Sequence, residues 1–345
     1  VNVFSDLKKS FWGKEDEEIN PSSQMNQAHG NLPEIFVESE KIYFDSIISF
    51  RNICNYIKES NSESIDCQVL MNSISKIIQI LKKDERLLLT LANAPYTFIL
   101  KKAELQQPSI IDTSVVIHGI NVMIYSLKIS LDIGIYESRL PYVGLAALAS
   151  HLGLLEHENE QLSQIDDLSK LRELARDSEK YIKKMATENI HLESIIQLTQ
   201  ISVENPQILS RTNLREGMYQ YAMVIKLCCD FEILTHKSKY SPIEAMKKLR
   251  DEMDSFFHPD IIKMFFDKLS IYPLGSFVKL SSQETAKIVK INESFIMRPI
   301  VLIVLDEEGI EKPKPAKINL REKFNLHIKH SVIDEQLTEH FLYMF

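Results

Sequence analysis

Two histidines and one aspartate lie in apolar segments of the chain, where polar side chains are uncommon. His118 follows Val115-Val116-Ile117, His151 follows Ala146-Ala147-Leu148-Ala149-Ser150, and Asp230 lies between Cys229 and Phe231. A carboxylate that is removed from water is costly unless a partner stabilises its charge. We therefore expect Asp230 to pair with an imidazole, and His118 and His151 are the nearest candidates.

Thiol chemistry is the second option that the residue types offer. The four cysteines are at positions 54, 67, 228 and 229, and none shows C-x-x-C spacing. Cys228 and Cys229 lie mid-helix in an apolar context, which raises the pKa of a thiol and argues against a nucleophile. We expect buried, reduced thiols, which are typical of a reducing compartment. The chain has no G-x-S-x-G, Walker or H-E-x-x-H motif.

Helices must position these residues. Apolar side chains recur at helical spacing between residues 42 and 108, which predicts a small helical module. Asp112-Thr113-Ser114 offers an N-cap for the helix that carries His118. Ser241-Pro242-Ile243-Glu244 is a second helix start, with Ser as the cap and Pro at the first position. Further helices are predicted over residues 139–155, 167–188, 190–203, 214–236 and 241–256.

The pattern changes from helical to alternating after Gly275. Residues 276–291 and 297–305 read as strands, and residues 306–309 read as a turn. We expect Pro313 and Pro315 to close this part, with a short β-like segment at 316–320 and an ambiguous end at 322–345. At the other end, residues 1–40 are polar and irregular, which is typical of an arm or linker.

Composition narrows the class of protein. The 345 residues are 44% hydrophobic and 26% charged, which is ordinary for a globular protein. The net charge of −8 argues against a general nucleic-acid binder, because phosphate affinity requires excess Lys and Arg. We find no run of about 18 apolar residues and no apolar segment of a signal peptide near the start. We therefore expect a cytoplasmic protein without a membrane span.

The segment Ala146-Ala147-Leu148-Ala149-Ser150-His151-Leu152-Gly153-Leu154 resembles the core of an HD-domain phosphohydrolase of the HD-GYP branch, which reads roughly A-A-L-L-H-D-I-G-K. Tyr221 to Thr235 resembles the family helix A-x-I-[IL]-x-[LV]-x-D-x-[FY]-[DE]-x-[LM]-T, with Asp230 taken as the ligand Asp. Ile271-Tyr272-Pro273-Leu274-Gly275-Ser276-Phe277-Val278-Lys279-Leu280 resembles the string that opens a small β appendage in many HD-GYP proteins. The resemblance covers roughly residues 112–310.

The resemblance also shows what this chain has lost. Ser150 and His151 replace the His-Asp pair that names the family. Ser202 and Val203 fall at a downstream pair of histidines, and Asp177 falls at a single histidine before it. The G-Y-P loop is absent, and Ile208 to Thr212 stand in its place.

The resemblance implies a mainly α fold, in which an HD-type multi-helix bundle follows a small helical module and precedes a small C-terminal β appendage. Together with the patterns described above, it divides the chain into an arm (1–40), a helical module (41–110), a degenerate HD-GYP-like domain (111–270) and a β-rich appendage (271–345). The resemblance implies that His118, His151 and Asp230 are vestigial metal ligands. The hydroxyl of Ser150 is a poor metal ligand, and the side chain of Val203 has no atom that can bind a metal. We therefore do not expect a dinuclear metal centre. We expect no cofactor, or at most one divalent metal ion.

Two functions follow from the resemblance. The first is a catalytically inactive relative that acts as a signalling, scaffold or interaction module, with binding of a cyclic dinucleotide such as cyclic di-GMP left open. The second is a divergent metal-dependent phosphohydrolase with a mononuclear site, because three N/O ligands and an open position form a catalytic arrangement. The altered positions favour the first. We expect a protein partner, and leave open a homodimer.

Overall fold

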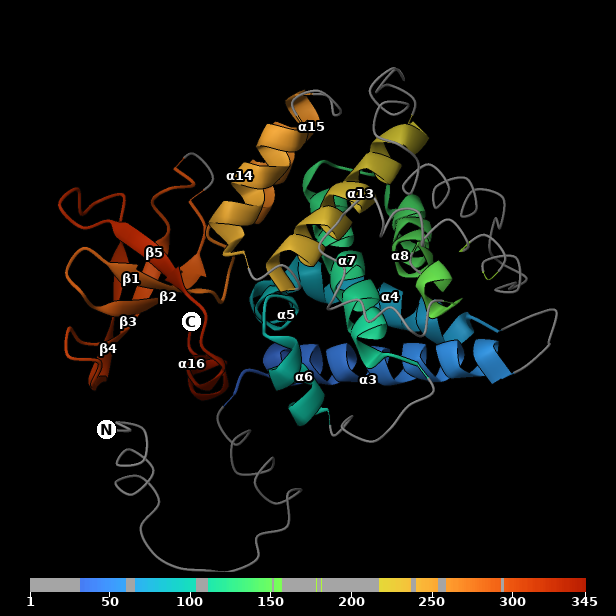
Figure 1. The fold of residues 1–345 in the computed structure, drawn as a ribbon, viewed down its shortest axis with the longest axis horizontal. Coiled ribbons are helices and arrows are strands. Elements are labelled where there is room, and N and C mark those ends of the chain that lie inside the picture. Colours follow the sequence, from blue (N-terminus) through green and yellow to red (C-terminus); the bar gives the residue numbers. More distant parts are fainter. Residues whose placement is uncertain are drawn as a thin grey trace, which may run out of the picture.

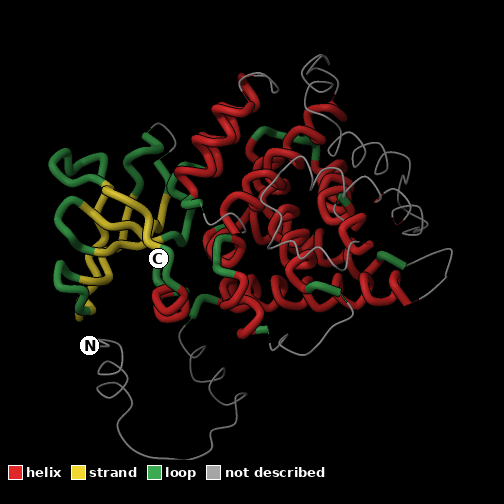
Figure 2. Tube along the Cα trace, in the orientation of Figure 1, coloured by secondary structure: helices red, strands yellow, loops and turns green. Residues whose placement is uncertain are grey.

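The computed structural model describes residues 32–59, 66–103, 111–150, 152–156, 178, 181, 217–236, 240–253, 259–292 and 295–345. Within these ranges a helical body precedes a small antiparallel sheet (Figure 1). Figure 2 shows that the strands gather at one end of the molecule and the long helices at the other. The predicted class, mainly α with a C-terminal β appendage, is confirmed at this level.

The chain enters the helical body earlier than the sequence predicts. Helix α3 spans Glu34–Glu59, so residues 34–40, which we assigned to the polar arm, are helical. Phe36 and Glu40 in this stretch are buried, and the Glu40 carboxylate pairs with Lys102 at 2.7 Å. The predicted arm included these residues because Glu40 is charged, and its buried partner Lys102 could not be identified from the sequence. The rest of the predicted arm, residues 1–31, lies outside the described residues.

Three further helices confirm the helical pattern predicted between residues 42 and 108. They are α4 (Gln68–Lys83), α5 (Arg86–Ala92) and α6 (Tyr96–Lys102). The apolar stripe of α4 packs against α3, α7 and α8, so this part of the chain does not form a core of its own.

Helix α7 (Thr113–Asp132) lies in the middle of the helical body (Figure 1). Its predicted cap is confirmed, because the Asp112 side chain accepts a hydrogen bond from Ser114 N at 2.9 Å. By length and composition it could cross a membrane, but 83% of its 18-residue apolar window is buried inside the molecule. Gly119 allows α3 to approach closely, since a Cβ there would lie 2.9 Å from the Phe50 ring.

The helices that follow surround α7. The predicted helix 139–155 is divided into a short 3₁₀ turn (Glu137–Arg139), α8 (Leu140–Ala149) and a second 3₁₀ turn (Leu152–Glu156). The predicted helices over 167–188 and 190–203 lie almost wholly outside the described residues.

Three helices complete the body. They are α13 (Gly217–His236), α14 (Pro242–Met253) and α15 (Pro259–Leu269). The predicted start of α14 is confirmed as a capping box: the Glu244 carboxylate accepts from Ser241 N at 2.9 Å, and Ser241 Oγ accepts from Glu244 N at 3.4 Å.

The β appendage is a five-stranded antiparallel sheet of order β4-β3-β2-β1-β5. The predicted strand 276–291 is a hairpin of β1 (Phe277–Leu280) and β2 (Thr285–Lys290), and β3 (Ile300–Leu305) lies beside it. The ambiguous end contains β5 (Ile328–Val332), which pairs with β1, and helix α16 (Glu335–Phe341).

Edge strand β4 (Glu311–Asn319) runs through Pro313 and Pro315, so the expectation that these prolines close the β region is wrong. The two prolines fall between the pairs Ile303↔Ala316 and Leu305↔Glu311, where the register is irregular. Proline cannot donate to a sheet ladder, but an edge strand with an irregular register requires no donor there.

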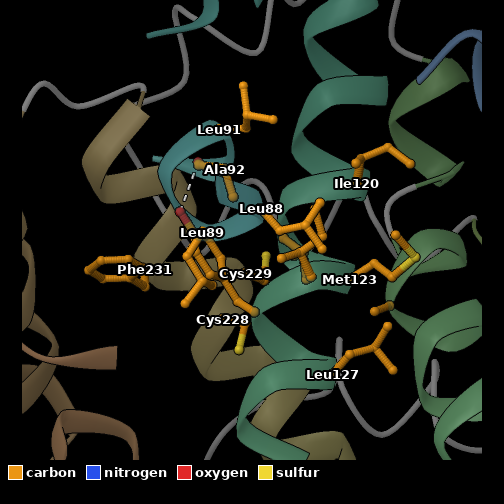
Figure 3. Close-up of a cluster of buried hydrophobic side chains, with 14 of the residues drawn as sticks. Leu88, Leu89, Leu91, Ala92, Ile120, Met123, Leu127, Cys228, Cys229 and Phe231 are labelled. Atoms are coloured by element: carbon orange, nitrogen blue, oxygen red, sulfur yellow. Dashed lines mark hydrogen bonds between the residues drawn. The ribbon is translucent and has the colours of Figure 1, made fainter. Parts of the chain in front are cut away.

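One hydrophobic core runs from Phe36 to Leu342 and crosses the expected boundary at residue 110. Figure 3 shows part of it, where side chains of α5, α7 and α13 meet. Leu88 and Leu91 come from α5, Met123 comes from α7, and Phe231 comes from α13. The polar groups of the candidate site lie within this packing.

Candidate functional site

His118 is the centre of the polar interior. It lies on α7 with no exposed surface, and its Nδ1 contacts the carboxylate of Glu232 on α13. A carboxylate can only accept hydrogen bonds when it is ionised. An ionised Glu232 therefore fixes a proton on Nδ1, and a neutral His118 imidazole then presents a lone pair on Nε2.

Glu232 is fully buried and has further partners. The Tyr96 hydroxyl donates to one carboxylate oxygen, which Asn121 Nδ2 also approaches at 3.2 Å and His236 Nδ1 at 3.5 Å. Burial alone would raise the pKa of the Glu232 carboxyl, but charge on His118 and His236, together with hydrogen bonds from His118 and Tyr96, holds that pKa well below its usual range. Glu232 is consequently an ionised hub that joins α6, α7 and α13.

A layer of tyrosines surrounds this hub. The Tyr43 hydroxyl donates to Asn121 Oδ1 at 2.8 Å, and the Tyr125 hydroxyl donates to Ala92 O at 2.8 Å. Burial, followed by the nearby negative charge of Glu232, raises the pKa of both phenols. These hydroxyls stay neutral donors, which suits a network that supports a single buried carboxylate.

Among the described residues, Cys229 contacts the other nitrogen of His118, with Sγ 3.8 Å from Nε2. This corrects the sequence assignment. When the family pattern is laid without a gap from Ala222 to Thr235, its aspartate falls on Cys229 and not on Asp230. A thiol therefore stands where the pattern has a carboxylate.

Asp230 and Lys226 form a separate buried pair on α13, 3.8 Å apart, and both side chains are 2% exposed. Because each helical residue turns the chain by about 100°, Asp230 and Glu232 point roughly 200° apart. A helix that directs Glu232 at His118 thus directs Asp230 away from it. The expected pairing of Asp230 with His118 is replaced by Glu232–His118 and Lys226–Asp230.

Ser150 ends α8 and contributes to a local turn. Its Oγ donates to Ala147 O at 2.9 Å, and its carbonyl accepts from Ser178 Oγ at 3.0 Å. Ser178 Oγ in turn accepts from Gly153 N at 2.8 Å. These hydroxyl contacts connect the end of α8 with Gly153 and Ser178.

Four predicted positions lie outside the described residues: His151, Asp177, Ser202 and Val203. What we expect of them stays a prediction. Within the described ranges, no group of three or more His, Cys, Asp or Glu side chains converges so that it could hold a metal ion.

All four cysteines are free and buried, which confirms the reading of reduced thiols. Burial raises the pKa of Cys228, in agreement with its expected inertness. Cys229 differs from Cys228 because it contacts an imidazole.

Comparison with known proteins concerns the β appendage. Residues 277–340 match a family model described as a KOW domain associated with HD domain. The match covers all five strands and most of α16. Neither the curated proteins nor the solved structures give a match to the chain. The finding points to proteins that contain an HD domain, in agreement with the coarser part of the resemblance.

Sequence reasoning did not find Glu232, Tyr96, Asn121, His236 or Lys226. One signal was available, because Glu232 and Lys226 are charged residues on a helix that is otherwise strongly apolar. Charges in such a context require partners. Their partners could not be identified, since the contact between His118 and Glu232 spans 114 residues of sequence.

Proposed function

We propose that this chain is a non-hydrolytic relative of HD-domain phosphohydrolases, which acts as a signalling, scaffold or interaction module. The carrying observation is that a thiol, Cys229, faces Nε2 of His118 where the family pattern has a carboxylate. Dinuclear HD chemistry requires carboxylate oxygens that can hold the metal ions beside imidazoles. The side chain of Cys229 offers a sulfur atom in place of the two oxygen atoms of a carboxylate.

The Lys226–Asp230 pair supports the same proposal. A buried carboxylate in a metal site has its charge balanced by the metal, whereas here Asp230 is balanced by an ammonium group 3.8 Å away. A buried lysine also repels an incoming divalent cation. Both effects disfavour a metal ion on the face of α13 that carries Asp230, the ligand that the resemblance assigns.

The match over residues 277–340 supports the other half of the proposal. It associates the sheet with HD-domain proteins, and the helix that follows the sheet, α16, contacts the helical body, since its Glu335 accepts from Thr97 on α6 at 2.7 Å. Our proposal is that the retained body and sheet together present a surface to a protein partner.

Metal content and turnover test the proposal. We would purify the full chain without chelator, measure bound metals, and assay cyclic di-GMP hydrolysis with added Mn²⁺ or Fe²⁺. We expect far less metal than one ion per chain and no turnover. A His118→Ala variant, as control, should have the same low metal content. Stoichiometric metal that is lost in His118→Ala, together with turnover, would overturn the proposal in favour of a divergent phosphohydrolase.

A thermal-shift titration with cyclic di-GMP separates two forms of the module. A ligand that binds only the folded state raises the apparent stability by RT ln(1 + [L]/Kd), so the shift keeps growing with ligand concentration. An increase in Tm that grows with the logarithm of the cyclic di-GMP concentration, without hydrolysis, would identify a cyclic-dinucleotide-binding module. An unchanged Tm at concentrations near the millimolar range would favour a module that binds protein partners only.

A further inference from the structure

Cys229, His118 and Glu232 form a chain of three contacting side chains from two helices. Cys229 Sγ lies 3.8 Å from His118 Nε2, and Nδ1 of the same ring contacts Glu232. Glu232 is held in turn by Tyr96 and Asn121. This is the order of groups that activates a nucleophile: a thiol, a base beside it, and a third group that orients the base.

The other three cysteines differ from Cys229 in access. Cys54, Cys67 and Cys228 have no exposed surface, whereas Cys229 is 6% exposed. Burial raises the pKa of the Cys67 thiol to about 12, and it raises the pKa of Cys54 and Cys228 further. The chain therefore supplies three internal reference thiols, one of them directly adjacent in sequence.

We propose that Cys229 is a nucleophilic thiol that captures small α,β-unsaturated carbonyl compounds, with His118 as the proton acceptor and Glu232 as the residue that orients the imidazole. The proposal rests on these contacts and does not depend on the scaffold role. It goes beyond that role, because it assigns a covalent chemistry to the interior of the helical body.

The reaction requires only groups that are present. The thiol proton passes to Nε2 of His118, and the sulfur electron pair forms a bond to the β-carbon of the acceptor. The π electrons of the C=C bond shift to the carbonyl oxygen, and the resulting enolate takes the proton back from the imidazolium. No leaving group or redox partner is required, and among the described residues His118 is the base that contacts Cys229. Sulfur is a soft, polarisable nucleophile that matches a soft carbon acceptor.

N-ethylmaleimide tests this directly, because it is a small α,β-unsaturated dicarbonyl. The native full chain is pulsed with the reagent at neutral pH, quenched with excess thiol, unfolded, blocked with an isotopically heavy form and digested. Mass spectrometry then gives a labelling rate for each cysteine. We expect Cys229 to label about 100-fold faster than Cys54 and Cys67, the lower end of what a positioned base contributes.

Two variants resolve the adjacent cysteines. Fast labelling should persist in Cys228→Ala and disappear in Cys229→Ala. Labelling of the unfolded chain should show equal rates at all four sites, which excludes a difference in intrinsic reactivity. Equal slow rates in the native chain, or fast labelling that survives in Cys229→Ala, would overturn the proposal.

The role of the imidazole is tested with His118→Gln and Glu232→Gln. Both should reduce the labelling rate of Cys229 toward that of Cys54. Slow labelling of Cys54 and Cys67 shows that a variant is folded. The test is therefore read from the variant in which these two cysteines still label slowly. Fast labelling of Cys229 in such a variant would mean that exposure alone explains the reactivity, which contradicts the proposed activation.

Discussion

At the scale of single residues, the polar interior depends on Glu232. Its carboxylate contacts His118, Tyr96, Asn121 and His236, which belong to three helices. A fully buried carboxylate with so many donors stabilises the fold only while all of them remain in place. A shorter acid or a neutral isostere at position 232 should therefore lower the stability of the protein.

Glu232→Gln should lower the free energy of unfolding by about 3 kcal/mol at pH 7, because two buried imidazoles lose their charged partner. The folded state lowers the pKa of this carboxyl below its ordinary value of 4.5. The wild-type stability due to Glu232 is thus present above pH 4.5 and is lost as pH falls below it, since the unfolded chain then binds the proton first.

Urea unfolding at pH 7 and at acidic pH, followed by circular dichroism, measures both effects. The free energy of unfolding of the variant should fall less between pH 7 and acidic pH than that of the wild type, because the variant lacks the carboxyl of Glu232. Glu308→Gln, in an exposed turn, serves as the control and should match the wild type. An unchanged acid dependence in Glu232→Gln would show that the carboxylate is not the group that titrates.

Lys287 is the second residue whose burial has a measurable consequence. Its Nζ donates to the carbonyls of Phe341, Leu342 and Met344 at 2.9, 2.7 and 3.1 Å. Burial lowers the pKa of Lys287 from 10.5 to about 7. Between pH 7 and pH 10.5, Lys287 is therefore protonated in the unfolded chain but deprotonated in the folded chain. The contribution of Lys287 to the free energy of unfolding should consequently increase with pH in this range.

Lys287→Met should remove that rise, which amounts to roughly 1.4 kcal/mol per pH unit across the window. The measurement is the free energy of unfolding of wild type and variant at several values between pH 7 and pH 10. Lys290→Met, at an exposed position of the same strand, is the matched control. If the wild type and Lys287→Met show parallel pH profiles, the proton on Lys287 is not displaced by folding.

At the scale of elements, the loop between α15 and β1 is held against α5 by one glycine. Gly275 has φ +83°, and a Cβ there would lie 2.5 Å from Thr90 Oγ1 and Cγ2. Gly275 N also donates to Ile288 O at 2.9 Å, which fixes the loop to β2. A side chain at this position would have to separate the loop from α5.

Gly275→Ala should therefore destabilise the protein by more than the about 1–2 kcal/mol that the left-handed conformation costs an L-residue. Gly309 provides the comparison, because it has φ +84° and open space around its Cα. Gly309→Ala should show the conformational cost alone in thermal or urea unfolding. Equal losses for the two variants would mean that contact with Thr90 adds nothing.

The sequence predicts elements better than it predicts contacts. The caps at Asp112 and Ser241 follow from local chemistry, and both are confirmed. The path of β4 through Pro313 and Pro315 could not be predicted, because only the strand order makes β4 an edge. The partner of His118 depends on helical phase, so a shift of one residue in the assigned pattern turned the expected ligand about 100° away from it.

At the scale of the whole molecule, α6 connects the sheet to the buried network. Tyr96 on one side of this short helix donates to Glu232, while Thr97 and Lys101 on the other contact Glu335 and Glu339 of α16. Beyond α16, the Tyr343 hydroxyl donates to Glu40 on α3 at 2.7 Å. The sheet and the helical body should consequently unfold together rather than as two independent units.

Removal of residues 334–345 tests this coupling. The truncation takes away the three carbonyls that accept from Lys287, and it uncovers the small apolar cluster in which Phe341 packs against Phe277. It also takes away the Tyr343–Glu40 contact on α3. Because these contacts join both parts to one core, we expect faster amide hydrogen exchange in α3, α6 and α7 as well as in β1 and β2.

The matched control for the truncation is Glu339→Gln, which removes only an exposed ion pair with Lys101 and should cost less than about 1 kcal/mol. Its exchange rates should match the wild type throughout. If exchange accelerates only in the sheet of the truncated chain, the helical body folds independently of it. The contacts of α16 with α6 would then not stabilise the contacts of Glu232. Accelerated exchange in α7 would instead show that the stability of the His118–Glu232 contact depends on the docking of the C-terminal helix, although these two groups do not touch α16 themselves.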